Sequence, residues 1–109
     1  MRQRNAVRIV PRSPITVAIQ DGGVPSAYGV VANISVAGAC IWTDAGLDTG
    51  RAVDLQLSFP RGSQLIDAEG VVVWGEPGGG TGSRRYGLRW TDQSAPGVAR
   101  LNRIIAASA

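Results

Sequence analysis

The sequence predicts a small, mainly β protein: a six-stranded antiparallel barrel with a flexible N-terminal arm and one C-terminal α-helix. Six short segments with strand-like apolar patterns follow one another at regular spacing. Glycine-rich turns separate these segments. The one stretch with apolar residues at helical spacing lies near the end of the chain. With 109 residues, the chain has the usual size of one domain and is too short for two.

The first three strands are expected at residues 15–20, 28–35 and 39–43. The first (ITVAIQ) alternates in polarity and ends at the turn signal Asp21-Gly22-Gly23. The second (YGVVANIS) leads into the third (ACIWT), which is followed by the loop 44–50. Cys40 lies in the apolar third segment, so we expect a buried, unreactive thiol. A single cysteine forms no internal disulfide, which fits a reducing cytoplasm.

The last three strands are expected at residues 53–59, 65–74 and 84–91. The first of these (VDLQLSF) alternates cleanly between apolar and polar residues. Its apolar side chains are expected to point inward: Val53, Leu55, Leu57 and Phe59. The longer segment 65–74 allows a bend at Gly70. The glycine-rich stretch 76–83 reads as the tip of the hairpin that leads to the sixth strand.

A helix is expected over residues 94–107. Ser94 is the expected N-cap, and Pro96 suits the first turn. The apolar residues form one stripe: Val98, Leu101, Ile104 and Ile105. The predicted layout is therefore a single domain over 1–109, with an arm over 1–13, a barrel over 14–92 and this helix.

The positive charge of the chain is concentrated in the arm. Residues 1–12 contain four of the eleven arginines and no acidic residue, and the other seven arginines are balanced by eight acids. A nearly neutral body argues against a broad surface for a nucleic acid polymer. A small-barrel binder of single-stranded nucleic acid, with a basic arm and aromatic residues, is a weaker alternative.

The sequence favours neither membrane insertion nor catalysis. No apolar run approaches the roughly 20 residues that span a bilayer, and no signal peptide is evident, so we expect a cytoplasmic protein. The chain has no histidine, which excludes a Ser-His-Asp triad and a histidine-bearing metal site. The glycine-rich stretch 76–83 lacks the Lys-Ser/Thr of a P-loop. We expect no catalytic residues, no metal and no cofactor.

Two short motifs carry the functional signal. RNAVR (residues 4–8) holds two arginines four positions apart, and NISVAG (residues 33–38) follows about two dozen residues later. Alone, the second motif indicates a turn, in which Gly38 permits a positive φ and Asn33 and Ser35 bond to the local backbone. Together with AEGVVVW (68–74) and YGLRWTDQS (86–94), the two motifs resemble the PilZ domain, a barrel family that binds the bacterial second messenger cyclic di-GMP.

The resemblance implies a cyclic di-GMP receptor without enzymatic activity. The residues that it assigns to the ligand are Arg4, Arg8, Asn33, Ser35 and Gly38. Arginine forks suit this ligand because they bind phosphate oxygens and the O6/N7 edge of guanine. Arg8 and Arg12 have the same spacing as Arg4 and Arg8, so the register of the arginine pair stays open and Arg12 is kept as a candidate.

Trp74 and Arg89 are further candidates for ligand contacts, although packing within the barrel is the favoured interpretation of Trp74. The resemblance also implies that the arm becomes ordered around the ligand and so creates or removes a surface for a downstream protein partner. The output, whether motility, biofilm exopolysaccharide or another, is not specified by these residues. A PilZ-like adaptor that binds protein but not the nucleotide is the alternative.

Overall fold

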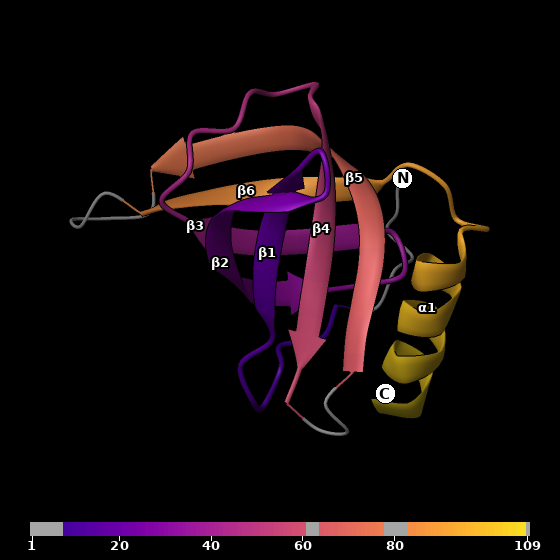
Figure 1. Ribbon diagram of the computed structural model, residues 1–109. Helices are drawn as coiled ribbons and strands as arrows, with labels where there is room; N and C mark the ends of the chain where they lie inside the picture. Colours follow the sequence, from indigo (N-terminus) through magenta and orange to yellow (C-terminus); the bar gives the residue numbers. More distant parts are fainter. Residues whose placement is uncertain (1–7, 61–63, 78–82, 109) are drawn as a thin grey trace, which may run out of the picture.

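Six antiparallel strands close into a barrel in the computed structural model of the protein, which describes residues 8–60, 64–77 and 83–108. The strands are β1 (Thr16–Asp21), β2 (Val24–Ile34), β3 (Gly38–Thr43), β4 (Ala52–Phe59), β5 (Gln64–Pro77) and β6 (Arg84–Trp90). Their order around the barrel is β1-β2-β3-β6-β5-β4. The helix α1 (Pro96–Ser108) lies beside β5 (Figure 1). The predicted fold class is confirmed.

The long strand β5 closes the barrel by pairing with two different neighbours. Its first part, from Gln64 to Val71, pairs with β4, and its second part, from Gly70 to Pro77, pairs with β6. Gly70 belongs to both ladders, opposite Val53 on one side and Trp90 on the other. Figure 1 shows the strand curving over between its two ends. A glycine suits a position where the strand changes direction among close neighbours.

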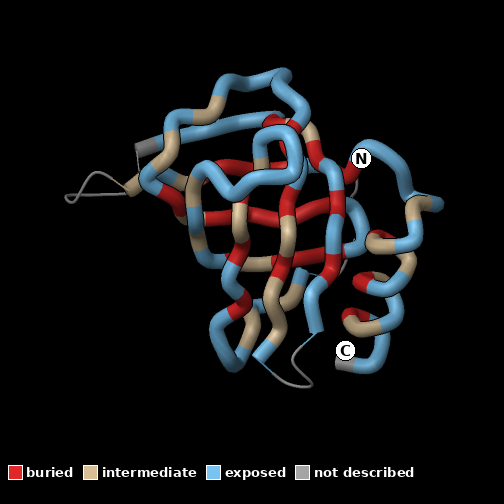
Figure 2. Tube along the Cα trace, viewed as in Figure 1, coloured by how far each residue is buried: buried red, intermediate tan, exposed pale blue. Residues whose placement is uncertain are grey.

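The core follows from the alternation that the sequence showed. Val53, Leu55 and Leu57 of β4 are buried inside the barrel, whereas Phe59 at the strand end is half-buried. The other strands contribute aliphatic residues and the ring of Trp90 to the same cluster. Buried positions recur on every strand, as Figure 2 shows. Each fully buried side chain of this size contributes about 1.5–3 kcal/mol relative to an exposed one.

β2 begins at Val24, four residues before the expected start. The turn that precedes it uses Gly22 and Gly23 at φ values of 62° and 84°, which glycine adopts without strain. The early part of β2 pairs with β1 alone, since its pairing with β3 starts at Gly29. Both faces of this free edge are largely exposed, so no apolar alternation marked it, and Pro25 is tolerated there.

The start of α1 differs from the expectation. The first helical hydrogen bond runs from Ala99 N to Ala95 O, which makes Ala95 the N-cap in place of Ser94. Ser94 donates instead through both N and Oγ to Asp92 Oδ1. These bonds form an Asx turn ahead of the helix and lower the pKa of Asp92. A helix-start signal does not distinguish a serine that caps from one that bonds the residue before it.

The apolar stripe of α1 packs against the barrel as expected. Val98, Leu101 and Ile105 are buried, and Ile104 is partly buried. Figure 2 shows the buried positions of the helix on the side that faces the barrel. Gly97 sets the closest approach, because a Cβ built there would lie 1.7 Å from the backbone oxygen of Asp67 in β5. The helix therefore touches β5 backbone to backbone at its first turn.

We expect Gly97→Ala to destabilise the protein by about 1–3 kcal/mol, because the added methyl group forces α1 away from β5. Helix propensity alone predicts the opposite sign, a gain of up to about 1 kcal/mol. Urea unfolding measures the difference. Gly46→Ala is the matched control, since a Cβ there meets only the Arg84 side chain at 3.5 Å. Equal stability of the two variants would refute the close contact.

Candidate ligand-binding site

The arm and the end of β2 are joined next to the predicted motif residues. Ile9 N donates to Ile34 O at 2.8 Å, and Ile34 N donates to Ile9 O at 3.0 Å. This bridge places Arg8 beside Asn33, and Arg8 Nη1 donates to Asn33 Oδ1 at 2.7 Å. The two motifs, 25 residues apart at this pair, therefore meet in space. Arg4, the other half of the expected pair, lies outside the described residues.

Ser35 builds the tight turn between β2 and β3. Its N donates to Gly38 O at 2.8 Å, and its Oγ accepts from Ala37 N at 3.1 Å. The indole of Trp90 holds the same turn from inside the barrel, because its Nε1 donates to Ser35 O at 3.3 Å. Ser35 is only 2% exposed. In this structure its hydroxyl serves the turn that lies beside the Arg8–Asn33 contact.

Gly38 is required by packing and not by its backbone angles. It does not adopt the left-handed conformation that the sequence suggested. A Cβ at Gly38 would lie 1.8 Å from Leu88 O, so only glycine allows β3 to approach β6 this closely. The close approach that the motif implied is therefore present, and it is made to a strand of the barrel.

A row of cross-strand neighbours, which we call the shelf, extends from the Arg8–Asn33 contact across the outside of the barrel. Asn33, Cys40, Gly87 and Trp74 are register partners on β2, β3, β6 and β5. Cys40 faces outward, because Ala39 and Ile41 on either side belong to the core. The ring of Trp74 lies over Gly87, where a Cβ would come within 2.1 Å of the indole Nε1. The shelf therefore has small residues in its middle and a tryptophan at its far end.

Cys40 is buried, as expected, although it belongs to the outer face of β3. Burial raises the pKa of its thiol, and the positive charges of Arg85 and Arg8 offset part of this rise. Both guanidinium groups are thus close enough to act on the same sulfur. Cys40 lies between two arginines that come from opposite sides of the shelf.

Trp74 is not packed inside the barrel, contrary to the favoured interpretation. Its side chain lies on the outer face and is 40% exposed. A strand bulge at Val73 shifts the register between β5 and β6, so the inward–outward alternation of VVVW cannot be extrapolated across it. The Arg85 guanidinium lies 5.6 Å from the Trp74 ring centre and 5.5 Å from that of Trp42. Arg85 also pairs with Glu76 across the β5–β6 ladder.

The other two candidate arginines lie at different places. Arg89 is exposed on the outer face of β6, opposite Gly38 of the turn. Arg12 is exposed and lines a cavity of about 480 Å³ between the arm and α1. The walls of this cavity are mostly apolar and include Ile9, Phe59 and Leu101. Arg12 is therefore near the helix side of the arm, whereas Arg8 contacts β2.

The described residues contain no group of three or more histidine, cysteine or acidic residues that could hold a metal ion. Within the same ranges, no helix has the length and apolar character needed to cross a bilayer. The side chains around the shelf suit ligand recognition: guanidinium groups bind anions, amide and carboxylate groups form hydrogen bonds, and indole rings bind flat ligands.

Sequence reasoning missed three members of this surface: Trp42, Arg85 and Glu76. Trp42 and Arg85 lie in segments expected as strands, and Glu76 lies in the stretch expected as a hairpin tip, which the structure instead includes in β5. Nothing in their local pattern separates a functional position from a structural or solvated one. One signal was available: Trp42, Trp74 and Arg85 lie in three strands that become neighbours when the barrel closes. That signal needs the strand order β3-β6-β5, which the sequence did not state.

The chain matches the family model of the PilZ domain over residues 2–107. Three solved structures share the fold. The inhibitor of motility MotI/DgrA of Bacillus subtilis is 20% identical, with a TM-score of 0.74 over 99% of this chain and 51% of that one. YcgR of Escherichia coli in complex with c-di-GMP is 15% identical, with a TM-score of 0.76 over 97% of this chain and 45% of that one. The PilZ domain of YcgR with c-di-GMP is 14% identical, with a TM-score of 0.72 over 97% and 91%.

This chain spans about half the length of the first two proteins. At these identities the likeness concerns the fold. No curated protein sequence is significantly similar to this chain.

Ser35→Ala is expected to lower the free energy of unfolding by about 1 kcal/mol, because Ala37 N loses its buried acceptor. Urea unfolding is the measurement. Ser58→Ala, at a half-buried position of β4, is the control and should change stability by no more than about 0.5 kcal/mol. If both serines behaved alike, the Ser35 hydroxyl would have no role in the turn.

Cys40 is expected to react slowly with iodoacetamide in the folded protein, because its thiol is covered and its raised pKa keeps it protonated. The rate should stay low up to pH 8.5 and rise sharply once the protein is unfolded in urea. Mass spectrometry of the alkylated fraction gives both rates. Similar rates in the folded and unfolded protein would contradict the burial of Cys40.

Proposed function

Because this chain belongs to the PilZ domain family, we propose that it is a receptor for cyclic di-GMP with no enzymatic activity of its own. The observation that carries the proposal is the contact of Arg8 with Asn33 beside the Ser35–Gly38 turn. It unites the two motifs that the family resemblance assigned to the ligand. The solved PilZ domain of YcgR, whose fold this chain shares, contains c-di-GMP.

Arg8 is suited to bind a phosphate or a guanine edge. Its side chain is exposed, and the one hydrogen bond described for it goes to Asn33 Oδ1, which leaves most of its five donors for a ligand. The Ile9–Ile34 bridge fixes the backbone next to it, so little further ordering is needed there on binding. Asn33 and the Ser35–Gly38 turn form the wall that faces Arg8.

The charge distribution supports an anionic ligand on this face. Arg8 of the arm and two arginines of β6, Arg85 and Arg89, border the shelf. Asp54 and Asp67 are exposed on β4 and the first part of β5, away from the β3–β6 pairing that supports the shelf. The acids nearer to the shelf are partnered: Glu76 pairs with Arg85, and Glu69 accepts from Thr91. A dinucleotide with two phosphates would therefore be attracted to the arginine side of the barrel.

The arm offers a physical route from ligand to output. Residues 9–13 line the cavity against α1, and Arg8 immediately precedes them. A ligand bound by Arg8 and Arg4 would hold the start of the arm against the barrel and so alter the surface made by the arm and α1. We place the response to a downstream protein partner there. An adaptor that binds its partner without the nucleotide remains the alternative outcome.

Isothermal titration with cyclic di-GMP tests the receptor function. We expect saturable binding by the wild type, and a loss of about 10- to 150-fold in affinity for Arg8→Ala and for Asn33→Ala, because each removes a charge-assisted hydrogen bond worth about 1.5–3 kcal/mol. Arg103→Ala, on the exposed face of α1, is the matched control and should bind normally. A wild type that gives no heat at high micromolar ligand would favour the adaptor.

The same titration settles the register of the arginine pair. If Arg4 and Arg8 form the pair, Arg4→Ala should weaken binding as much as Arg8→Ala does, whereas Arg12→Ala should have little effect. If Arg8 and Arg12 form the pair, Arg12→Ala should weaken binding as much as Arg8→Ala does, whereas Arg4→Ala should have little effect. Equal affinity of all three variants and the wild type would contradict the arginine clamp itself.

A further inference from the structure

The cavity between the arm and α1 lies at one end of the barrel. Its walls come from the start of β1, the ends of β2 and β4, the start of β5 and the second half of α1, and arm residues 9–13 close the remaining side. Figure 1 shows the end of β4, the start of β5 and the last turn of α1 at the same end of the molecule. The volume of about 480 Å³ is in the range of small-molecule sites in proteins.

The lining of the cavity changes from polar and exposed at its rim to aliphatic and buried at its floor. Arg12, Ser13 and Gln64 form the rim, and all three are exposed. The floor consists of buried residues of the core: Ile15, Ile34, Leu101 and Ile105. These four side chains have no polar atom, so they pair with no polar group of a ligand. A ligand that fits this gradient enters with an apolar end first.

Apolar side chains between rim and floor are incompletely covered. Ile9, Phe59 and Ile104 are only partly buried against the core. Val10 of the arm, which also lines the cavity, is 73% exposed. Removing apolar surface from water is the main favourable contribution to binding in such a place. An aliphatic chain laid along these residues would cover them.

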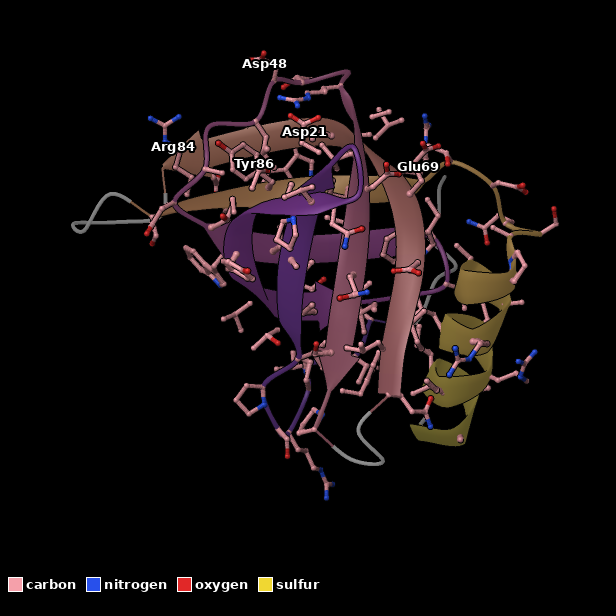
Figure 3. The ribbon with its side chains drawn as sticks, in the orientation of Figure 1. Asp21, Asp48, Glu69, Arg84 and Tyr86 are labelled. Carbon is pink, nitrogen blue, oxygen red and sulfur yellow. The ribbon has the colours of Figure 1, made fainter. Side chains whose placement is uncertain are left out.

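Arg12 gives the rim a positive charge that no acidic residue neutralises. No hydrogen bond or ion pair joins its guanidinium to another residue of the described ranges. All eight acidic residues of the chain lie in these ranges, and none of them lines the cavity. Figure 3 shows Asp21, Asp48 and Glu69 toward the end of the molecule opposite to the start of β5. A guanidinium with free donors at the edge of an apolar cavity suits a carboxylate.

The cavity is separate from the Arg8–Asn33 contact. Ile9 and Ile34, which bridge the arm and β2, line the cavity, whereas Asn33 belongs to the shelf on the outside of the barrel. Successive side chains of a strand point to opposite faces, so Asn33 faces away from the cavity that Ile34 lines. A ligand in the cavity therefore leaves the Arg8–Asn33 contact accessible.

We propose that this cavity binds a linear aliphatic carboxylate, with its tail along the apolar floor and its carboxylate at Arg12. The proposal does not rest on the receptor function proposed above. A polypeptide segment fits less well, because it would bring backbone N–H and C=O groups against floor side chains that cannot pair with them. The aliphatic ligand would pack between the arm and α1 and so hold residues 9–13 in place.

Isothermal titration with octanoate, decanoate and dodecanoate, each below its micelle concentration, tests the site. We expect saturable binding that strengthens by about 4-fold for each CH₂ group buried. Decyltrimethylammonium, with the opposite charge, should bind more weakly than decanoate. Arg12→Gln should weaken decanoate binding by about 2- to 5-fold, the value of an exposed ion pair. Arg103→Gln is the matched control, because Arg103 is exposed on α1 and does not line the cavity.

Methyl NMR of the isoleucines locates the ligand. Five of the eight isoleucines line the cavity: Ile9, Ile15, Ile34, Ile104 and Ile105. Decanoate should shift the methyl signals of these five and leave those of Ile19 and Ile41, which are buried in the barrel outside the cavity lining, unchanged.

Three results would overturn the proposed site: no saturation by any of the three carboxylates, methyl shifts spread equally over both sets of isoleucines, or unchanged decanoate affinity in Arg12→Gln. Arg8→Ala separates this site from the receptor function, since it should bind decanoate normally while its affinity for cyclic di-GMP falls. A wild type that binds decanoate but not cyclic di-GMP would overturn the receptor function and support the cavity site.

Discussion

The pairing of β6 between β3 and β5 is the constraint on which the rest of the structure depends. β3 and β6 are separated by the 40 residues 44–83, and β5 pairs with β4 through its first half and with β6 through its second. This arrangement closes the barrel and leaves no unpaired edge along β6. It also creates the outer surface on which residues from four strands become neighbours.

Close backbone contacts hold that surface in place. Gly38 allows β3 to approach the carbonyl of Leu88, and Gly87 makes room for the Trp74 ring. Trp90 connects the interior to the exterior, because it lies in the core and its indole N–H bonds the Ser35 carbonyl of the β2–β3 turn. The turn beside Arg8 and Asn33 is thus fixed by the core itself. A rigid wall of this kind reduces the ordering cost of binding a ligand.

The arm connects the shelf with the apolar cavity beside α1. Its Arg8 contacts the shelf through Asn33, and the residues that follow line the apolar cavity beside α1. The loop 44–50, at the opposite end of the barrel, is held differently: the Tyr86 hydroxyl donates to Ala45 O and accepts from Leu47 N, and Figure 3 shows the ring near this loop. Of these two segments, the arm is the one that runs from the proposed site to the helix α1, whereas the loop 44–50 does not.

The sequence by itself determined the elements whose residues show a period: the inward face of β4, the apolar stripe of α1, six strands and the two motifs of the proposed site. It also indicated that Arg8 and Asn33 would meet, through the family resemblance. Only the tertiary structure decided the roles of Gly38 and Trp74, since the first depends on a strand distant in sequence and the second on a local bulge. The Trp42–Arg85–Trp74 cluster was likewise decided by the tertiary structure alone. Ser94 bonds the nearby Asp92, which a helix-start signal does not distinguish from capping. Local patterns report which face of a strand is buried, whereas neighbours across strands are set by barrel closure.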